Sequence, residues 1–317
     1  MGRERYFHLG WIAIWGWLAL LGCQETTCPG LDATLWHQHS EEYETLCSNL
    51  YAHATLRLRE AMNDATWSAD LSQMGRTHLP QEMAVVLDLD ETVLNNAPLF
   101  ARVMKKPVTN MGKAWADWAR EASALPIAGA VPFVRHALDK GVYVFFVSNR
   151  SCRIDDATRK NMAQAGFPVD HPKLVFLSRN VDFNDVDKVE KCPALEATVA
   201  TRFGVASPRF YLYKGERRRL IAAKYRVLLF IGDSQGDFHS ISPMSASSAR
   251  ERERLLKARL TPEERSKINK SYGRYFHDRW MQLPNAMYGN WLSSRTGYRA
   301  LPIGEVVQQR LSLLNLN

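Results

Sequence analysis

Short runs of apolar residues, each followed by polar residues, divide the central part of the chain. The run Ala84–Leu87 consists of Ala, Val, Val and Leu, and it leads directly into Asp88, Asp90 and Thr92. Continuous Val- and Leu-rich runs of this length are typical of strands that are buried on both faces in a parallel sheet. The pattern therefore predicts a buried strand with two carboxylates beyond its end, where parallel sheets place their ligand sites.

Three further apolar runs have the composition of strands, and each ends in polar residues. These runs are Tyr143–Arg150, Phe210–Lys214 and Val227–Phe238. The polar residues at their ends are, in chain order, Ser148 with Asn149, Lys214, and Asp233 with Asp237. Because the carboxyl ends of parallel strands meet at one edge of a sheet, we expect these side chains to face a common site.

Helical patterns alternate with the predicted strands. Asp155–Gly166 is expected to be a crossover helix that leads to a strand at Lys173–Leu177. This alternation implies an α/β fold, a parallel sheet with helices on both faces. Further helices are expected in an N-terminal arm at Leu35–Leu71, in an insertion at about 97–140, in Arg250–Tyr275 with a capping box at Thr261, and in Leu301–Asn317.

The acid pair indicates a particular chemistry. Asp88 and Asp90 would repel each other and lose hydration in a buried site, so a compensating cation is expected, and Mg²⁺ prefers oxygen ligands. In phosphoryl transfer, one carboxylate attacks phosphorus and carries an aspartyl phosphate, while the other exchanges protons with the leaving oxygen and with water. Taken alone, the pattern also fits a metal site in a loop or a solvated turn.

The other polar strand ends fit the same chemistry. The hydroxyl of Ser148 and the side chain of Asn149 can hold a phosphate, and the ammonium of Lys214 can neutralise it. Asp233 and Asp237 are suitable additional Mg²⁺ ligands. Each residue also has a purely structural interpretation: a polar turn after a strand, a solvated lysine, or an aspartate that caps a helix.

Taken in order, the acid pair, hydroxyl, lysine and second acid pair resemble the haloacid dehalogenase superfamily of phosphatases. More narrowly, the chain resembles the class C acid phosphatases of the lipoprotein e type. The narrower resemblance rests on three further segments, Ala114–Trp118, Pro126–Ala130 and Leu283–Trp291. It extends from about Leu35 to Trp291, and it implies a Rossmann-like core with a parallel sheet, helices on both faces and a helical cap or extension.

The resemblance also assigns roles to the polar residues. It implies that Asp88 is the nucleophile and that Asp90 is the general acid and base, with its backbone carbonyl on the metal ion. The side-chain ligands of Mg²⁺ would be Asp88 and Asp233, and Asp237 would join them directly or through water. Ser148 and Lys214 would bind the phosphate.

Aromatic residues occur in the segments that would surround the pocket. The family resemblance implies nucleoside monophosphates as substrates, with the base stacked between aromatic rings, and it implies an acidic pH optimum. Tyr288, together with Trp115 or Trp118, is the candidate for this stacking. The alternative is that these rings belong to the core, as closely spaced aromatics on a helix commonly do.

The first residues have the pattern of an export signal. Arg3 and Arg5 precede an apolar stretch that is too short for a comfortable membrane span. Leu-Leu-Gly before Cys23 resembles a bacterial lipobox, so we expect residues 1–22 to be removed and Cys23 to carry the lipid of an outer-membrane lipoprotein. The alternative is an ordinary signal peptide that is followed by a cysteine by chance.

The rest of the chain is expected to form one unit. Residues 23–34 would be a tether, and 35–317 a single phosphatase domain. The net charge of +8 fits an anionic nucleotide or membrane surface, and it fits solubility equally well. Glutamates balance the basic residues of Arg250–Tyr275, so no nucleic-acid partner is expected. The oligomeric state stays open, with a homodimer as one option.

Export would place the chain in an oxidising compartment, where disulfides form. The four cysteines after Cys23 allow three pairings, and their spacing suggests Cys28–Cys47 and Cys152–Cys192. The alternative is free cysteines that are buried as small hydrophobic residues. No Cys/His spacing indicates a zinc site.

The sequence therefore predicts a lipid-anchored, Mg²⁺-dependent acid phosphatase that acts on nucleoside monophosphates. Two alternatives are kept: a phosphatase for other phosphomonoesters, and a non-catalytic surface lipoprotein that binds a ligand or haem. The second alternative does not explain the acid pairs, Ser148 and Lys214, because a binding protein needs no attacking carboxylate.

Overall fold

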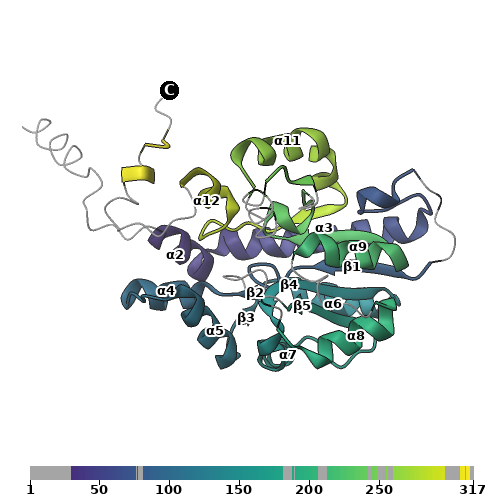
Figure 1. Ribbon diagram of the computed structural model, residues 1–317, viewed down its shortest axis with the longest axis horizontal. Coiled ribbons are helices and arrows are strands. Elements are labelled where there is room, and N and C mark those ends of the chain that lie inside the picture. Colours follow the sequence, from purple (N-terminus) through teal and green to yellow (C-terminus); the bar gives the residue numbers. More distant parts are fainter. Residues whose placement is uncertain are drawn as a thin grey trace, which may run out of the picture.

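The fold is described from a computed structural model (Figure 1). The described residues are 30–75, 77, 81–180, 188, 190–205, 213–241, 245–248, 251, 255, 260–296, 308–310 and 312–314. The predicted signal segment, Cys23, Cys28 and most of Leu301–Asn317 lie outside them. Within the described residues, no helix combines the length and the apolar composition that a membrane span requires.

A five-stranded parallel sheet forms the centre of the molecule, in the order β5-β4-β1-β6-β7. The strands are β1 Met83–Leu87, β4 Tyr143–Ser151, β5 Leu174–Arg179, β6 Arg226–Gly232 and β7 Trp280–Gln282. From β1 the sheet extends through β4 to β5 on one side and through β6 to β7 on the other. The strand order thus reverses beside β1, and α/β sheets bind ligands at such a switch point.

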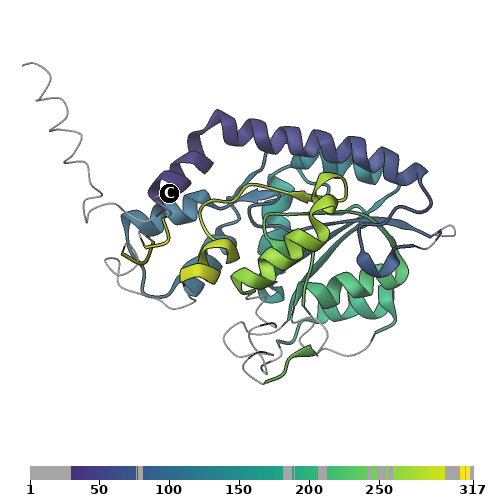
Figure 2. The same cartoon turned by 90° about the horizontal axis from the view of Figure 1, so that it is seen from above.

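Helices cover the sheet, and the molecule is elongated along the arm helix α3 (Figures 1 and 2). The helices are α2 Leu31–His39, α3 Glu41–Asn63, α4 Ala97–Lys105, α5 Met111–Glu121, α6 Ala130–Asp139, α7 Asp155–Gln164, α8 Pro193–Phe203, α9 Lys214–Lys224, α11 Pro262–Tyr272 and α12 Asn290–Thr296. A short antiparallel pair, β2 Leu94–Asn95 and β3 Leu125–Pro126, links the loop after β1 to the end of the inserted helices α4 and α5.

The strands are buried on both faces. Val85 and Leu87 of β1 pack in one apolar cluster with residues of α3, α6 and α7, whereas Ala84 and Val86 pack in a second cluster with residues of α8 and α9. Successive side chains of a strand point to opposite faces, so a strand between two helical layers needs apolar residues at every position. This explains the uninterrupted apolar run, and the predicted α/β fold is confirmed.

The structure contains several of the predicted helices and strands. Helix α7 and strand β5 confirm the crossover unit, and the capping box at Thr261 is present, with Thr261 N donating to Glu264 Oε2 at 2.7 Å. The prediction for Phe210–Lys214 is wrong at its end, because Lys214 begins helix α9 instead of ending a strand, and Phe210 itself lies outside the described residues. Strand β7 was not predicted.

Of the two suggested disulfides, one is confirmed and the other is wrong. Cys152 and Cys192 form a disulfide that joins the end of β4 to the start of α8. Cys47 is a free, buried thiol on α3, so the suggested bond to Cys28 is not formed. Cys47 instead packs in the apolar cluster as a small hydrophobic residue.

Candidate active site

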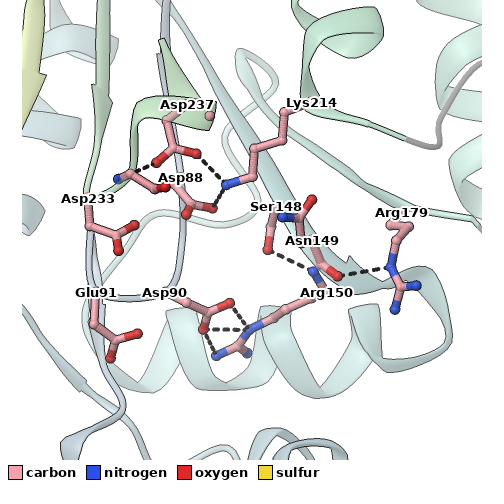
Figure 3. Close-up of polar contacts among 12 residues, drawn as sticks. Asp88, Asp90, Glu91, Ser148, Asn149, Arg150, Arg179, Lys214, Asp233 and Asp237 are labelled. Atoms are coloured by element: carbon pink, nitrogen blue, oxygen red, sulfur yellow. Dashed lines mark hydrogen bonds and ion pairs between the residues drawn. The ribbon is translucent and has the colours of Figure 1, made fainter. Parts of the chain in front are cut away.

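Neighbouring strands bring the predicted polar residues to one end of the sheet. Asp88 follows β1, Ser148 lies in the C-terminal part of β4, and Asp233 follows β6. The register is held by the backbone, where Asp88 N donates to Ile231 O at 3.0 Å. Figure 3 shows that Asp88, Asp233 and Ser148 lie in the same region as Lys214, so residues that are far apart in the chain share one site.

Three carboxylates form a cluster at this site. One oxygen from each of Asp88, Asp233 and Asp237 lies within 4.8 Å of the others. Burial raises the pKa of Asp88 to about 7, an effect that Lys214 opposes and Asp237 reinforces. Burial and repulsion from Asp237 also raise the pKa of Asp233 well above its ordinary value. Such a crowded set of oxygen ligands fits a divalent cation, which would relieve the repulsion.

Lys214 supplies a fixed positive charge beside this cluster. Its Nζ lies 2.7 Å from Asp88 Oδ1 and 2.6 Å from Asp237 Oδ1, and the side chain is buried (Figure 3). Burial acts to lower the pKa of Lys214, but the attraction of Asp237 and Asp88 outweighs burial and raises it. The ammonium therefore remains charged at the place where a phosphate would meet Asp88.

Asp237 and Asp233 are held in different ways. Asp237 uses Oδ1 for Lys214, while its Oδ2 accepts from Ser234 N at 2.9 Å in a capping box around the 3₁₀ turn Gln235–Asp237. Asp233 Oδ2 accepts a hydrogen bond from Asn285 Nδ2 at 2.8 Å. Because both oxygens of Asp237 are engaged, the geometry favours Asp88 and Asp233 over Asp237 as direct metal ligands.

Asp90 is oriented by a buried arginine. Arg150 Nη2 and Nε lie 2.7 and 3.0 Å from Asp90 Oδ1, and Asn96 Nδ2 donates to the same oxygen at 2.9 Å. The Arg150 side chain is 1% exposed and that of Asp90 is 14% exposed. Burial acts to lower the pKa of Arg150, but the attraction of Asp90 outweighs it and raises the pKa. Arg150 thus fixes the orientation of the Asp90 carboxylate, while part of this carboxylate remains exposed to solvent.

Glu91 is a buried carboxyl next to the acid pair. It lies in the left-handed backbone region with φ 54°, accepts from Asn96 N at 2.7 Å, and also accepts from the Tyr288 hydroxyl. Burial raises the pKa of Glu91 well above its ordinary value, and repulsion from Asp90 adds to the shift. Glu91 therefore ties the loop after β1 to the segment that carries Tyr288.

A second buried arginine, Arg217, holds the predicted phosphate-binding residues of β4 by hydrogen bonds. Ser148 Oγ is buried and accepts from Arg150 N at 3.0 Å, and a hydroxyl that accepts one bond can still donate another. Asn149 is exposed, and its Oδ1 accepts from Arg217 Nη2 at 3.2 Å. Arg217 is fully buried and donates from Nη1 to the carbonyl groups of Ser148 and Leu177.

Of the aromatic residues predicted to bind the base, two lie at the rim of the site and one lies in the apolar core. Tyr288 stacks on Phe100 with ring centroids 4.8 Å apart, and Trp115 approaches Tyr288 edge-on at 5.8 Å. Trp118 is 3% exposed, and its Nε1 donates to Asn96 Oδ1 at 2.8 Å. The prediction that Trp118 stacks on the substrate is therefore wrong, because its ring is enclosed by the core. Tyr288 and Trp115 are half-buried and keep this role as a prediction.

The family of the chain follows from its match to a family model. Residues 24–291 match the model of the HAD superfamily, subfamily IIIB, of acid phosphatases. The chain belongs to this acid phosphatase family. It is therefore a phosphomonoesterase whose substrate is a small phosphomonoester, and the non-catalytic alternative is set aside.

Solved structures agree with the fold of this acid phosphatase. The class C acid phosphatase from Bacillus anthracis is 24% identical with a TM-score of 0.65, and the match covers 90% of this chain and 96% of that chain. A structure of the Bacillus anthracis enzyme with tungstate bound is 23% identical with the same TM-score, covering 92% and 99%. HAD phosphatases use a divalent metal ion, which agrees with the acidic cluster.

Several residues of the acid phosphatase site were not assigned from the sequence. Arg150 lies two positions after Ser148 in the same predicted strand, but nothing in the sequence shows that its partner is Asp90. Arg217 and Arg218 lie three and four positions after Lys214, and this helical spacing is the signal that places them on the same buried face. Asn96 and Asn285 carry no comparable signal.

Proposed function

We propose that this acid phosphatase is a Mg²⁺-dependent enzyme that hydrolyses nucleoside monophosphates through an aspartyl phosphate on Asp88. The observation that carries the proposal is the meeting of Asp88, Asp233, Asp237 and Lys214 at one end of the sheet. A nucleophilic carboxylate, a buried ammonium and a cluster of oxygen ligands are the groups that attack on a phosphate dianion requires.

The carboxylate cluster suits Mg²⁺, which takes a few protein oxygens and keeps waters and phosphate oxygens as its other ligands. Asp88 and Asp233 would hold the ion through their side chains, with the backbone carbonyl of Asp90, and Asp237 would support them through water or directly. The bound ion would supply neutralisation of the phosphate charge.

The residues of the chain would divide the reaction as follows. Lys214 and Ser148 hold phosphate oxygens, and Asn149 assists at the exposed edge. Asp88 forms a bond to phosphorus while the bond from phosphorus to the leaving oxygen breaks, and Asp90 gives its proton to that oxygen. Asp90 then takes a proton from water, which attacks phosphorus and breaks its bond to Asp88. The first step needs a protonated Asp90, which accords with an acidic pH optimum.

The rim of the site supports a nucleotide as the substrate. Tyr288 and Trp115 are half-buried beside the loop that carries Asp88 and Asp90, and the bond between Tyr288 and Glu91 fixes the height of the tyrosine ring above this loop. Each aromatic stack on a base contributes about 1–3 kcal/mol. A nucleobase would therefore bind here while its phosphate reaches Asp88.

The substrate proposal is tested by comparing adenosine 5′-monophosphate with glycerol 3-phosphate, which lacks a base. We expect Tyr288→Ala to raise KM for the nucleotide about tenfold, from the loss of one stack, and to leave KM for glycerol 3-phosphate unchanged. Tyr288→Phe is the matched comparison, because it keeps the stacking ring and loses only the bond to Glu91, so it should raise KM for the nucleotide less than Tyr288→Ala does. An equal change for both substrates would show that Tyr288 does not bind the base.

The metal proposal is tested by chelation. We expect EDTA to abolish phosphate release and added Mg²⁺ to restore it, because the acid cluster repels a phosphate when no cation is bound. Unchanged activity after exhaustive chelation would contradict a metal requirement.

We also propose that Cys23 carries a lipid and holds the enzyme at the outer membrane, on its periplasmic or surface face. The support is the lipobox-like sequence before Cys23 and the basic, apolar segment that precedes it. Fractionation of cells that express the full chain or Cys23→Ser tests this. The full chain should sediment with outer membranes, and equal distribution of both proteins would contradict the anchor.

A further inference from the structure

Two neighbouring cavities lie beside the acid cluster. One cavity of about 350 Å³ is lined by Asp233, Tyr288 and Trp291, and a second cavity of about 520 Å³ is lined by residues of α11 and α12. Arg265 and Trp291 line both cavities, so the two are adjacent. Helices α11 and α12 lie side by side in both views (Figures 1 and 2). The cavity that the metal-ligand candidate Asp233 lines therefore adjoins the groove between these helices.

The second cavity is strongly basic. Arg265, Lys270 and Arg295 line it, and no acidic residue is among the described residues that do so. Lys270 and Arg295 are exposed and form no ion pair in the part of the chain that the structure describes. Lys270 and Arg295 add two exposed cations to this wall, and the positive potential that they produce attracts an anion.

Two polar atoms in the wall of the cavity point to a ligand that also carries hydroxyl groups. Gln235 is 2% exposed, and its Oε1 has no hydrogen-bond partner among the described residues. The same holds for the buried Oγ of Ser294. Gln235 belongs to the 3₁₀ turn that carries Asp237, so the wall of this cavity is built from the same turn as the acid cluster. Buried polar atoms without a partner are unfavourable, so a sugar hydroxyl that reaches them through a small shift of the wall would be bound favourably.

We propose that this cavity binds a second phosphate, on the leaving-group side of the substrate. The enzyme would then favour phosphomonoesters that carry two phosphates, such as nucleoside 3′,5′-bisphosphates, over the corresponding monophosphates. The scissile phosphate lies at Asp88, the sugar passes Asp233 and Tyr288, and the second phosphate meets Lys270 and Arg295. This inference rests on the proposed function in so far as the phosphate at Asp88 is the one that is cleaved.

The test uses competition against a common substrate. Hydrolysis of p-nitrophenyl phosphate by the full-length enzyme is measured with adenosine 5′-monophosphate or adenosine 3′,5′-bisphosphate as the competitor. We expect the bisphosphate to compete about tenfold more strongly, from two additional charge-assisted hydrogen bonds. This advantage should shrink as the salt concentration rises, because both cations are exposed to solvent.

Variants show whether the cavity causes the difference. In the double variant Lys270→Gln/Arg295→Gln, the two nucleotides should compete equally. Lys267→Gln is the matched control, because Lys267 is an exposed lysine of the same helix that lines neither cavity, and it should keep the full difference. If both nucleotides compete and do so equally in the wild type, or if a difference survives in the double variant, the proposal is overturned.

A second substrate pair separates this inference from the nucleotide proposal. Fructose 6-phosphate and fructose 1,6-bisphosphate differ by one phosphate and contain no base. If neither nucleotide competes but the sugar bisphosphate is favoured over the monophosphate in the wild type and not in the double variant, the base-binding proposal fails and the second phosphate site stands. No preference for either bisphosphate would refute the second phosphate site.

Discussion

Arg150 donates two hydrogen bonds to Asp90, from Nη2 at 2.7 Å and from Nε at 3.0 Å, and both reach the same carboxylate oxygen. Arg150 comes from the end of β4, and Asp90 from the loop after the neighbouring strand β1. The pair is largely buried, so it fixes the orientation of the proposed acid and base relative to Asp88.

Removal of this arginine should affect both stability and rate. Breaking a buried ion pair leaves a carboxylate without its partner, so Arg150→Ala should lower the free energy of unfolding by about 3 kcal/mol. It should also lower kcat more than it changes KM, because Asp90 loses its orientation. Arg150→Lys should restore little, since a lysine cannot reproduce the fork. Urea unfolding and steady-state kinetics measure these effects.

Arg120→Ala is the matched control for this prediction. Arg120 forms an ion pair with Asp117 on the exposed face of α5, with side chains 58% and 47% exposed, and exposed pairs contribute little. We expect nearly wild-type stability and kinetics. If Arg150→Ala behaves like Arg120→Ala, Arg150 does not position Asp90.

Gly232 should be indispensable because Asp237 folds back over it. A methyl group at position 232 would lie 2.6 Å from Asp237 Cγ, which no side-chain contact tolerates. Gly232→Ala should therefore displace Asp237 from Lys214 and lower kcat about a hundredfold, as expected for a misplacement of about 1 Å. Gly273→Ala is the control, because its methyl group would meet no atom within 4 Å. Full activity of Gly232→Ala would show that Asp237 is dispensable.

The disulfide should stabilise the part of the chain that follows β4. Cys152 and Cys192 are 40 positions apart, and closing a loop of this length contributes about 3–4 kcal/mol through the unfolded state. Cys152→Ser/Cys192→Ser should lose this amount in urea unfolding. Wild-type protein in reductant should match the double variant, and the double variant should not respond to reductant. Equal stability of all samples would contradict a stabilising disulfide.

Asp155, at the start of α7, should make stability depend on pH. Burial raises its pKa from 3.8 to about 6, although the hydrogen bond from Ser178 opposes the shift. Between about pH 4 and pH 6 the folded state therefore holds more protons than the unfolded state, so this carboxyl lowers the free energy of unfolding as the pH rises. Relative to wild type, Asp155→Asn should gain stability from pH 4 to pH 7. A constant difference across this range would contradict the shift.

The sequence predicts those site residues that lie at the ends of strands. Asp88 and Asp233 directly follow uninterrupted apolar runs, and such runs identify buried parallel strands whose ends meet. The apolar residues before Lys214 suggest a strand, whereas the lysine begins a helix, so the sequence indicates the residue but not the element that carries it. Its position beside Asp88 depends on how α9 packs, which local sequence does not determine.

Other features depend on tertiary contacts that leave no local pattern. Trp115 and Trp118 are three residues apart on α5, and only the docking of this helix shows that one faces the rim and the other the core. Strand β7 has three residues, too few for a periodic signal. The partnership of Arg150 with Asp90 joins residues 60 positions apart, so it becomes visible only when β1 and β4 are paired.

The central claim is that Asp88 attacks phosphorus, and phosphate release by Asp88→Asn in the presence of Mg²⁺ tests it most directly. The account predicts that the amide, which is a poor nucleophile, lowers kcat at least about a thousandfold, while circular dichroism shows a folded protein. Asp170→Asn, a change at an exposed aspartate, should keep the wild-type rate. A folded Asp88→Asn protein that releases phosphate at a rate comparable to wild type would contradict the account.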